Sequence, residues 1–99
     1  MSTTERYQGW ANWDTWETAL ILTNDYDFYI RSYVPWLKNF QRKIKRGIFD
    51  RDLAKKAIRL YLLPFARKED PDIDPKKVNL DEILDSMLED VKGLGSEGP

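Results

Sequence analysis

The stretch that decides the fold is residues 25–47, DYDFYIRSYVPWLKNFQRKIKRG. Its apolar side chains recur in steps of three and four, which is the pattern of one face of an α-helix. Asp25 is placed to cap the start of this helix, and Gly47 to end it. Pro35 removes a backbone hydrogen bond, but the apolar stripe keeps its phase across it, so we expect one long bent helix over 26–46. The stripe consists of Tyr26, Tyr29, Ile30, Tyr33, Leu37, Phe40 and Ile44.

A first helix is predicted before this stretch, over residues 13–23. Asn12 is a favoured N-cap residue, and Asn24 is suited to a left-handed residue at the C-terminal end. The spacing places Trp13 and Trp16 on one face of this helix, which we expect to enter the core.

Two further helices are predicted after the long one. One spans 50–65, and Pro64 is expected to help end it. The other spans 79–92 and begins with a capping box formed by Asn79 and Glu82. No segment alternates with a period of two, so the predicted fold class is all-α, a small single-domain bundle of about four helices. The apolar face predicted for the third helix is Leu53, Ala54, Ala57, Ile58, Leu60 and Tyr61.

The chain of 99 residues contains no Cys and no His. This composition excludes disulfides, Cys/His zinc sites and imidazole catalysis, so we expect no enzyme activity, no cofactor and no metal site. Asp70, Asp72, Asp74 and Asp81 have a spacing similar to that of an EF-hand calcium loop. However, Pro75 stands where such a loop needs glycine, and a polar loop is the better interpretation.

The termini carry no targeting pattern. The first residues lack a basic start followed by an apolar run, and no apolar stretch approaches the ~20 residues that span a bilayer. We therefore expect a cytoplasmic protein that does not interact with membranes. The domain is predicted to cover residues 1–99, with a flexible lead-in over 1–8 and a disordered tail over 93–99.

The formal net charge of −1 conceals a strong segregation of charge along the chain. Residues 1–30 sum to −4, residues 31–68 to +10 and residues 69–99 to −7. The basic middle forms one face on each of the second and third helices, and such faces are candidates for binding a phosphate backbone. The alternative is a solvated surface that the acidic last helix partly neutralises. The candidate basic residues are Lys38, Arg42, Lys45 and Arg46 on the second helix, and Lys55, Lys56 and Arg59 on the third.

Aromatic residues gather in the block over residues 7–16, YQGWANWDTW. Three tryptophans at a spacing of three could stack bases or grip a peptide. The alternative is that they wrap the start of the first helix and pack in the core, against Tyr29, Tyr33, Trp36 and Leu37 of the long helix. Trp10 precedes the helix and is the best candidate of the three for a contact residue.

This block also carries a resemblance to a known family. It resembles the opening of a family of small uncharacterised proteins, encoded mainly by bacteriophages and plasmids, that begin with Gly-Trp-x-Asn-Tyr-x-Thr-Trp and an Asn-Asp step. That family tends to close with Val-Asn-aromatic-x-Glu-Ile, which residues 78–83 match with Leu80 in place of the aromatic. The resemblance covers about the first 25 residues and the last helix, and it implies a mobile-element origin and a small helical domain, but no reaction. The matching residues are Gly9, Trp10, Asn12, Trp13, Thr15, Trp16, Asn24 and Asp25.

Together these observations favour binding over catalysis. The leading hypothesis is an accessory protein of a phage or plasmid that binds a host or defence protein in the host cytoplasm. Opposed charged regions suit such electrostatic recognition. The alternative is nucleic-acid binding through the basic helix faces, and the oligomeric state stays open.

Overall fold

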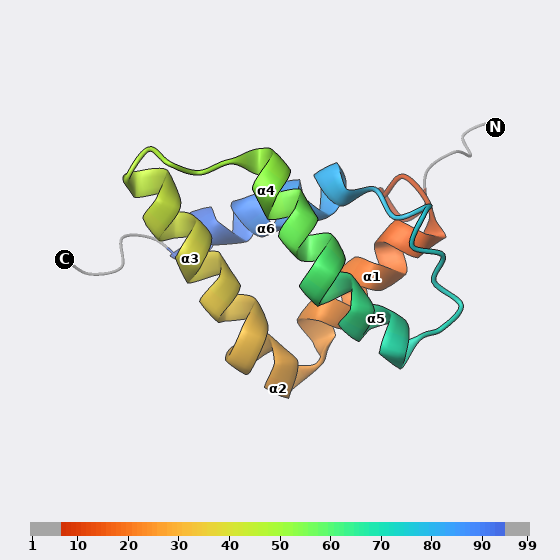
Figure 1. Cartoon of the computed structure of the whole chain (residues 1–99). Helices are drawn as coiled ribbons and strands as arrows, with labels where there is room; N and C mark the ends of the chain where they lie inside the picture. The colour runs from red at the N-terminus through yellow and green to blue at the C-terminus, as the bar shows by residue number, and fades with distance from the viewer. Residues whose placement is uncertain (1–6, 95–99) are drawn as a thin grey trace.

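The computed structural model describes residues 7–94, which form four helical rods and no β-strand (Figure 1). This confirms the predicted all-α fold and the order of its helices. The rods are α1 (Trp13–Asn24); α2, η1 and α3 (Tyr26–Phe28, Tyr29–Tyr33 and Val34–Lys45); α4, η2 and α5 (Arg51–Ala57, Ile58–Leu62 and Leu63–Glu69); and α6 (Leu80–Leu94).

Both prolines inside the rods follow a π-helical turn. The turn η1 precedes Pro35, and the turn η2 precedes Pro64. A π turn is wider than an α turn, which gives the proline ring space beside the carbonyl of the preceding turn. The second rod is therefore continuous across Pro35, as predicted. The prediction that Pro64 helps end the third rod is wrong, because the rod runs on to Glu69.

Local caps set the ends of the rods. The side chains of Asn12 and Asp25 accept hydrogen bonds from backbone amides in the first turns of α1 and α2, as predicted. Gly47 has φ +73, and the amide of Ile48 donates to the Lys43 carbonyl, which closes α3 with a Schellman motif. Asn24 ends α1, but it is not left-handed as predicted. The chain instead turns at the extended Asp25, which immediately starts the next helix.

The termini were predicted to be a lead-in and a tail. Tyr7 and Trp10 exchange both backbone hydrogen bonds across a tight turn. Gln8 and Gly9, its central residues, both have positive φ, as in a type I′ turn. At the other end, residues 93–94 belong to α6. Residues 1–6 and 95–99 lie outside the described part of the chain.

The core forms where α6 packs against α1, α3 and α4. In Figure 1, α6 crosses behind α3 and α4 and joins them to α1. All four rods and the loop before α6 contribute buried apolar side chains. These are Leu22, Tyr33, Leu37, Phe40, Ala54, Ile58, Leu62, Leu63, Ala66, Ile73, Val78, Ile83, Leu84, Met87 and Val91.

The predicted apolar faces are only partly buried. On the second rod the middle of the stripe is buried, but Tyr26, Ile30 and Ile44 are exposed. On the third rod the buried residues at positions 54, 58, 62 and 66 follow steps of four, and Leu63 is buried beside them. Leu53, Leu60 and Tyr61 belong to the predicted face but are exposed. This face was predicted too wide, because only the arc that meets α6 and α1 has a partner to pack on.

Candidate functional site

The N-terminal aromatic block is tied to the loop before α6 by hydrogen bonds. Asn12 Nδ2 donates to the Lys77 carbonyl at 2.8 Å, and the Asp74 amide donates to Asp14 Oδ1 at 2.9 Å. Together with the hydrogen bonds of Thr15 and Glu82, these contacts form a polar seam. The polar seam is made of Ala11, Asn12, Asp14 and Thr15 on one side and Asp74, Lys77, Asn79 and Glu82 on the other.

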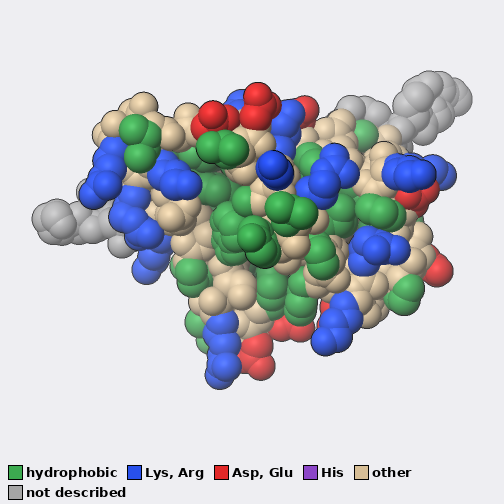
Figure 2. Space-filling view, in the orientation of Figure 1, with side chains coloured by type: hydrophobic (Ala, Val, Ile, Leu, Met, Phe, Trp, Pro, Cys, Tyr) green, Lys and Arg blue, Asp and Glu red, His purple; other side chains and the backbone are tan. Residues whose placement is uncertain are grey.

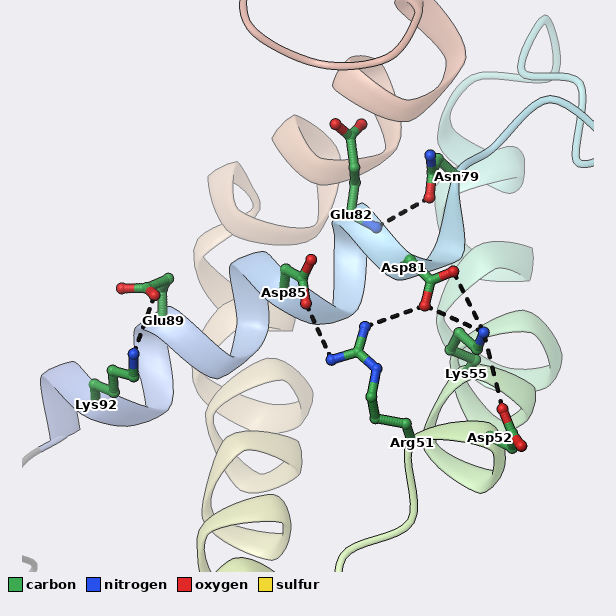
Figure 3. Close-up of polar contacts among 9 residues, drawn as sticks. All are labelled: Arg51, Asp52, Lys55, Asn79, Asp81, Glu82, Asp85, Glu89 and Lys92. Atoms are coloured by element: carbon green, nitrogen blue, oxygen red, sulfur yellow. Dashed lines mark hydrogen bonds and ion pairs between the residues drawn. The ribbon is translucent and has the colours of Figure 1, made fainter.

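Thr15 lies at the centre of the polar seam and is 0% exposed. Its hydroxyl donates to Asn12 Oδ1 at 2.8 Å and accepts from the Asn79 amide at 2.9 Å. Asn12 caps α1, while Asn79 Oδ1 accepts from the Glu82 amide at the start of α6 (Figure 3). One hydroxyl therefore joins the starts of two helices that are far apart in the sequence.

The predicted capping box of α6 is correct in one half and wrong in the other. Asn79 accepts from the Glu82 amide as expected. The Glu82 carboxylate, however, accepts from the Ala11 amide at 2.7 Å, and the Asn79 amide donates to Thr15. Tertiary contacts thus replace the reciprocal local bond. The two sequence segments that carry the family resemblance contact each other in the polar seam.

The three tryptophans of the block are all half-buried. Trp10 and Trp13 pack against the edge of the core, and the Trp16 ring meets the Tyr7 ring edge-on at 5.0 Å. The prediction that the block packs against the long helix is wrong for Trp36, whose ring lies beside the rings of Phe40 and Tyr61. Helix α1 does contact η1, which contains Tyr29 and Tyr33. The block closes the N-terminal end of the fold around α1 and the loop before α6.

Figure 3 shows a second polar contact of α6, an ion-pair cluster with the start of α4. The Arg51 guanidinium lies 3.1 Å from Asp81 and 3.0 Å from Asp85, and Lys55 Nζ lies 3.1 Å from Asp81. Hydrogen bonds from Arg51 and then Lys55 hold the pKa of the Asp81 carboxyl below its ordinary value. Acidic α6 thus neutralises Lys55, one of the candidate basic residues. Sequence reasoning did not single out Arg51, since only the fold brings it to α6.

The other candidate basic residues fall into two groups. Lys56 and Arg59 are exposed beside Lys55, in an open hollow that Val78 and Leu80 also line. On the second rod only Arg42 of the four candidates lines a different hollow, and within residues 7–94 none of the four forms a salt bridge. The two predicted basic faces thus border different hollows. The second group is Lys38, Arg42, Lys45 and Arg46, all exposed.

An apolar groove lies between the second and third rods. We call it the α3–α4 groove. It consists of two adjoining hollows that share Trp36, Asn39, Lys43 and Ala57. Figure 2 shows hydrophobic side chains gathered at the centre of this face, with Lys and Arg side chains on both sides. The other lining residues are Pro35, Phe40, Arg42, Ile48, Phe49, Asp50, Leu53 and Ala54.

Aromatic rings connect the surface of the α3–α4 groove to the core. The Trp36 ring centroid lies 6.1 Å from that of Tyr61 and 5.8 Å from that of Phe40, and Phe40 lies 5.4 Å from Phe49. On the third rod, Leu53 is 63% exposed and Tyr61 is 65% exposed. Sequence reasoning assigned both to the core. The available signal was an apolar face wider than one row of buried residues, but this signal does not tell which row faces the core.

The aspartates of the loop after α5 serve the backbone. The carboxylates of Asp70 and Asp74 each accept from the amide two residues on. Asp70 also lies beside Glu17, and the hydrogen bond between these two acids raises the pKa of Glu17. Across residues 7–94, no group of His, Cys, Asp and Glu side chains is arranged to hold a metal ion. In the same range no helix has the length and apolar character needed to cross a membrane.

Comparison with known proteins identifies a family. Neither the curated proteins nor the solved structures contain a significant match to this chain. One family profile matches residues 3–98, including the middle third of the chain, which the motif resemblance did not reach. Its description is "Family of unknown function (DUF7249)", which agrees with the resemblance to an uncharacterised family. The chain belongs to this family, DUF7249.

Proposed function

We propose that this protein is a non-catalytic binding protein and that the α3–α4 groove is the place where it binds another protein. The observation that carries the proposal is the exposure of Leu53 in the groove lining and of Tyr61, whose ring lies beside the partly open Trp36. Contiguous exposed apolar side chains mark interaction sites, and Trp and Tyr contribute a large share of binding energy at protein interfaces.

The polar groups favour binding over catalysis. The sequence supplies no His or Cys as base or nucleophile. Several carboxylates already have structural partners: Asp14 in the polar seam, Asp74 in its loop turn, and Asp81 in the ion-pair cluster. A catalytic carboxylate pair would instead need to face a shared substrate cleft.

The partner that we propose is a host or defence protein, and the setting is the cytoplasm of a cell that carries a phage or plasmid. The motif resemblance from Gly9 to Asp25 supports this origin. A small protein with an exposed apolar groove is suited to act by occupying a surface of another protein.

Affinity capture from a bacterial lysate tests this function. The bait is the intact protein, and the groove variant is Tyr61→Ser. Tyr26→Ser is the matched control, because Tyr26 is 76% exposed and lies on α2, outside the groove lining. A specific protein retained by the wild type and the control but lost from Tyr61→Ser supports the proposal. The absence of any specific protein, or equal retention by all three baits, contradicts it.

Nucleic-acid binding is the second candidate, and the exposed basic residues of the second rod favour it. Lys38, Arg42 and Lys45 have no salt bridge within residues 7–94. The test is a salt titration against duplex DNA and single-stranded RNA, with charge reversal of these three residues to Glu. Retention that falls steeply with salt and disappears on charge reversal would favour this candidate. Failure to bind at low salt would exclude it.

A further inference from the structure

We infer that the α3–α4 groove binds an amphipathic helix of the partner protein, one that carries Asp and Glu beside its apolar side chains. This inference rests on the proposed function, because it takes the groove as the protein-binding site. It adds the conformation and the charge of the bound segment.

The shape of the groove matches a helix. Trp36, Asn39 and Lys43 follow one wall at helical spacing, and Leu53 and Ala57 lie on the other wall, on the third rod. The row from Trp36 to Lys43 is roughly 10 Å long, which is two helical turns. Amphipathic helices bind such grooves through side chains at i, i+3 or i+4, and i+7.

The floor of the groove offers a pocket for one anchor. The inner hollow is closed below by Phe40 and Ala54 and has a volume of about 60 Å³. A hollow with an apolar floor of this kind suits one aliphatic anchor such as a leucine side chain. The rings of Trp36 and Tyr61 then offer flat surfaces to the neighbouring anchors.

The charge around the groove selects an acidic partner. Arg42 and Lys43 line the outer hollow, and residues 31–46 carry six bases and no acid. On the other side, Lys56 is exposed next to Ala57. The one carboxylate in the lining, Asp50, already accepts from the amides at the start of α4. The field over the groove is therefore positive, which steers carboxylates towards it and repels basic helices.

Other occupants fit the groove less well. A nucleic acid would use the basic residues but would gain nothing from aliphatic side chains such as Ile48 and Leu53. In a second copy of this chain the acidic helix α6 matches the charge, but its apolar side chains, including Leu84 and Met87, are already buried. Within residues 7–94 the protein therefore offers no free acidic amphipathic helix of its own.

Selection from a displayed library of randomised helical peptides tests the inference on the folded, full-length protein. We expect enriched peptides with an apolar stripe over two turns and with Asp and Glu on both sides of it. Tyr61→Ser should weaken their binding by about tenfold or more, since buried Tyr contacts are common hot spots. Tyr26→Ser should leave binding unchanged, and it controls for loss of an exposed tyrosine.

The double variant Arg42→Glu with Lys43→Glu tests the contribution of the basic residues to peptide binding. This double variant should weaken the acidic peptides most at low salt. The control is Lys76→Glu with Lys77→Glu, which changes the net charge equally in the loop after α5, outside the groove lining. We expect the control to bind nearly as well as the wild type.

Several results would overturn the inference, and they separate it from the proposed function. Enriched peptides without acidic residues would keep the groove as a protein-binding site but refute the acidic helix. Enriched peptides that still bind Tyr61→Ser would place their site elsewhere. No enrichment, with a protein still captured from lysate, would refute the helix and leave the binding function standing. A dimer that Tyr61→Ser dissociates in sedimentation would make a second copy the occupant.

Discussion

The polar seam and the α3–α4 groove invert the usual relation between side-chain polarity and burial. In the seam Thr15 is 0% exposed, whereas in the groove Leu53 is 63% exposed. The Thr15 hydroxyl has hydrogen-bond partners within the fold. The apolar side chains of the groove instead border a hollow that another molecule can fill. Burial thus follows the available partners, and this comparison separates what holds the fold from what is free to bind.

The largest stability loss among these predictions is that of Thr15→Val. Valine keeps the shape but removes the acceptor of the Asn79 amide, and an unsatisfied buried group costs about 1–3 kcal/mol. Urea unfolding should show a loss of this size in the free energy of unfolding. Thr18→Val is the matched control, because Thr18 is also 0% exposed but its hydroxyl donates only to the Asp14 carbonyl of its own helix. Equal losses for the two variants would refute the special role of the seam.

Tyr33→Phe should have an intermediate effect. The Tyr33 hydroxyl donates to Asp90 Oδ2 at 2.7 Å, and burial, with Asp90 as the second cause, raises the tyrosine pKa above its ordinary value. The phenol therefore stays protonated and serves as a donor. Because Asp90 is exposed and regains water in the variant, we expect a loss of about 1 kcal/mol in urea unfolding. No measurable loss would mean that this bond adds nothing to stability.

Tyr61→Ser should leave stability nearly unchanged, although it removes a large aromatic side chain. Exposed positions tolerate substitution within about ±0.5 kcal/mol. The free energy of unfolding of this variant in urea should therefore stay close to that of the wild type, while its peptide binding is weakened. A loss above about 2 kcal/mol would show that Tyr61 belongs to the core, and the groove would then be part of the architecture.

Arg51→Gln should produce the smallest effect, visible mainly in a pH titration. The folded pKa of Asp81 is lowered, so the ion pair stabilises the fold above the unfolded pKa of Asp81 and is lost as the pH falls through the folded pKa. In the variant the Asp81 pKa should rise towards its ordinary value, as followed by carboxyl NMR signals. An unchanged pKa would mean that Lys55 alone is responsible.

The starts of three rods could be predicted from the sequence because N-terminal capping is local. Asn12, Asp25 and Asn79 each accept from an amide three residues on, and such patterns are visible in a single sequence. The end of the third rod could not be predicted. The π turn before Pro64 lets the helix continue past the proline, and no local sequence pattern marks such a turn.

The polar seam and the groove lay beyond sequence reasoning for different reasons. The seam joins residues 64 positions apart, as between Thr15 and Asn79, and no periodicity reports such a pair. The groove depends on which arc of the third rod meets α6, so Leu53 and Tyr61 could not be separated from Ala54 and Ile58 by spacing alone. The charge pattern of the sequence predicted Arg42 as a binding residue, but it did not predict the apolar surface beside it.

The most direct test of the central claim uses the four tryptophans as reporters. Trp36 lines the α3–α4 groove, whereas Trp10, Trp13 and Trp16 belong to the block beside the polar seam. The indole N–H signals are followed by NMR while a selected acidic helical peptide is added. The account predicts that the Trp36 signal shifts and the other three stay in place. Shifts of the three block signals with an unmoved Trp36 signal would contradict it.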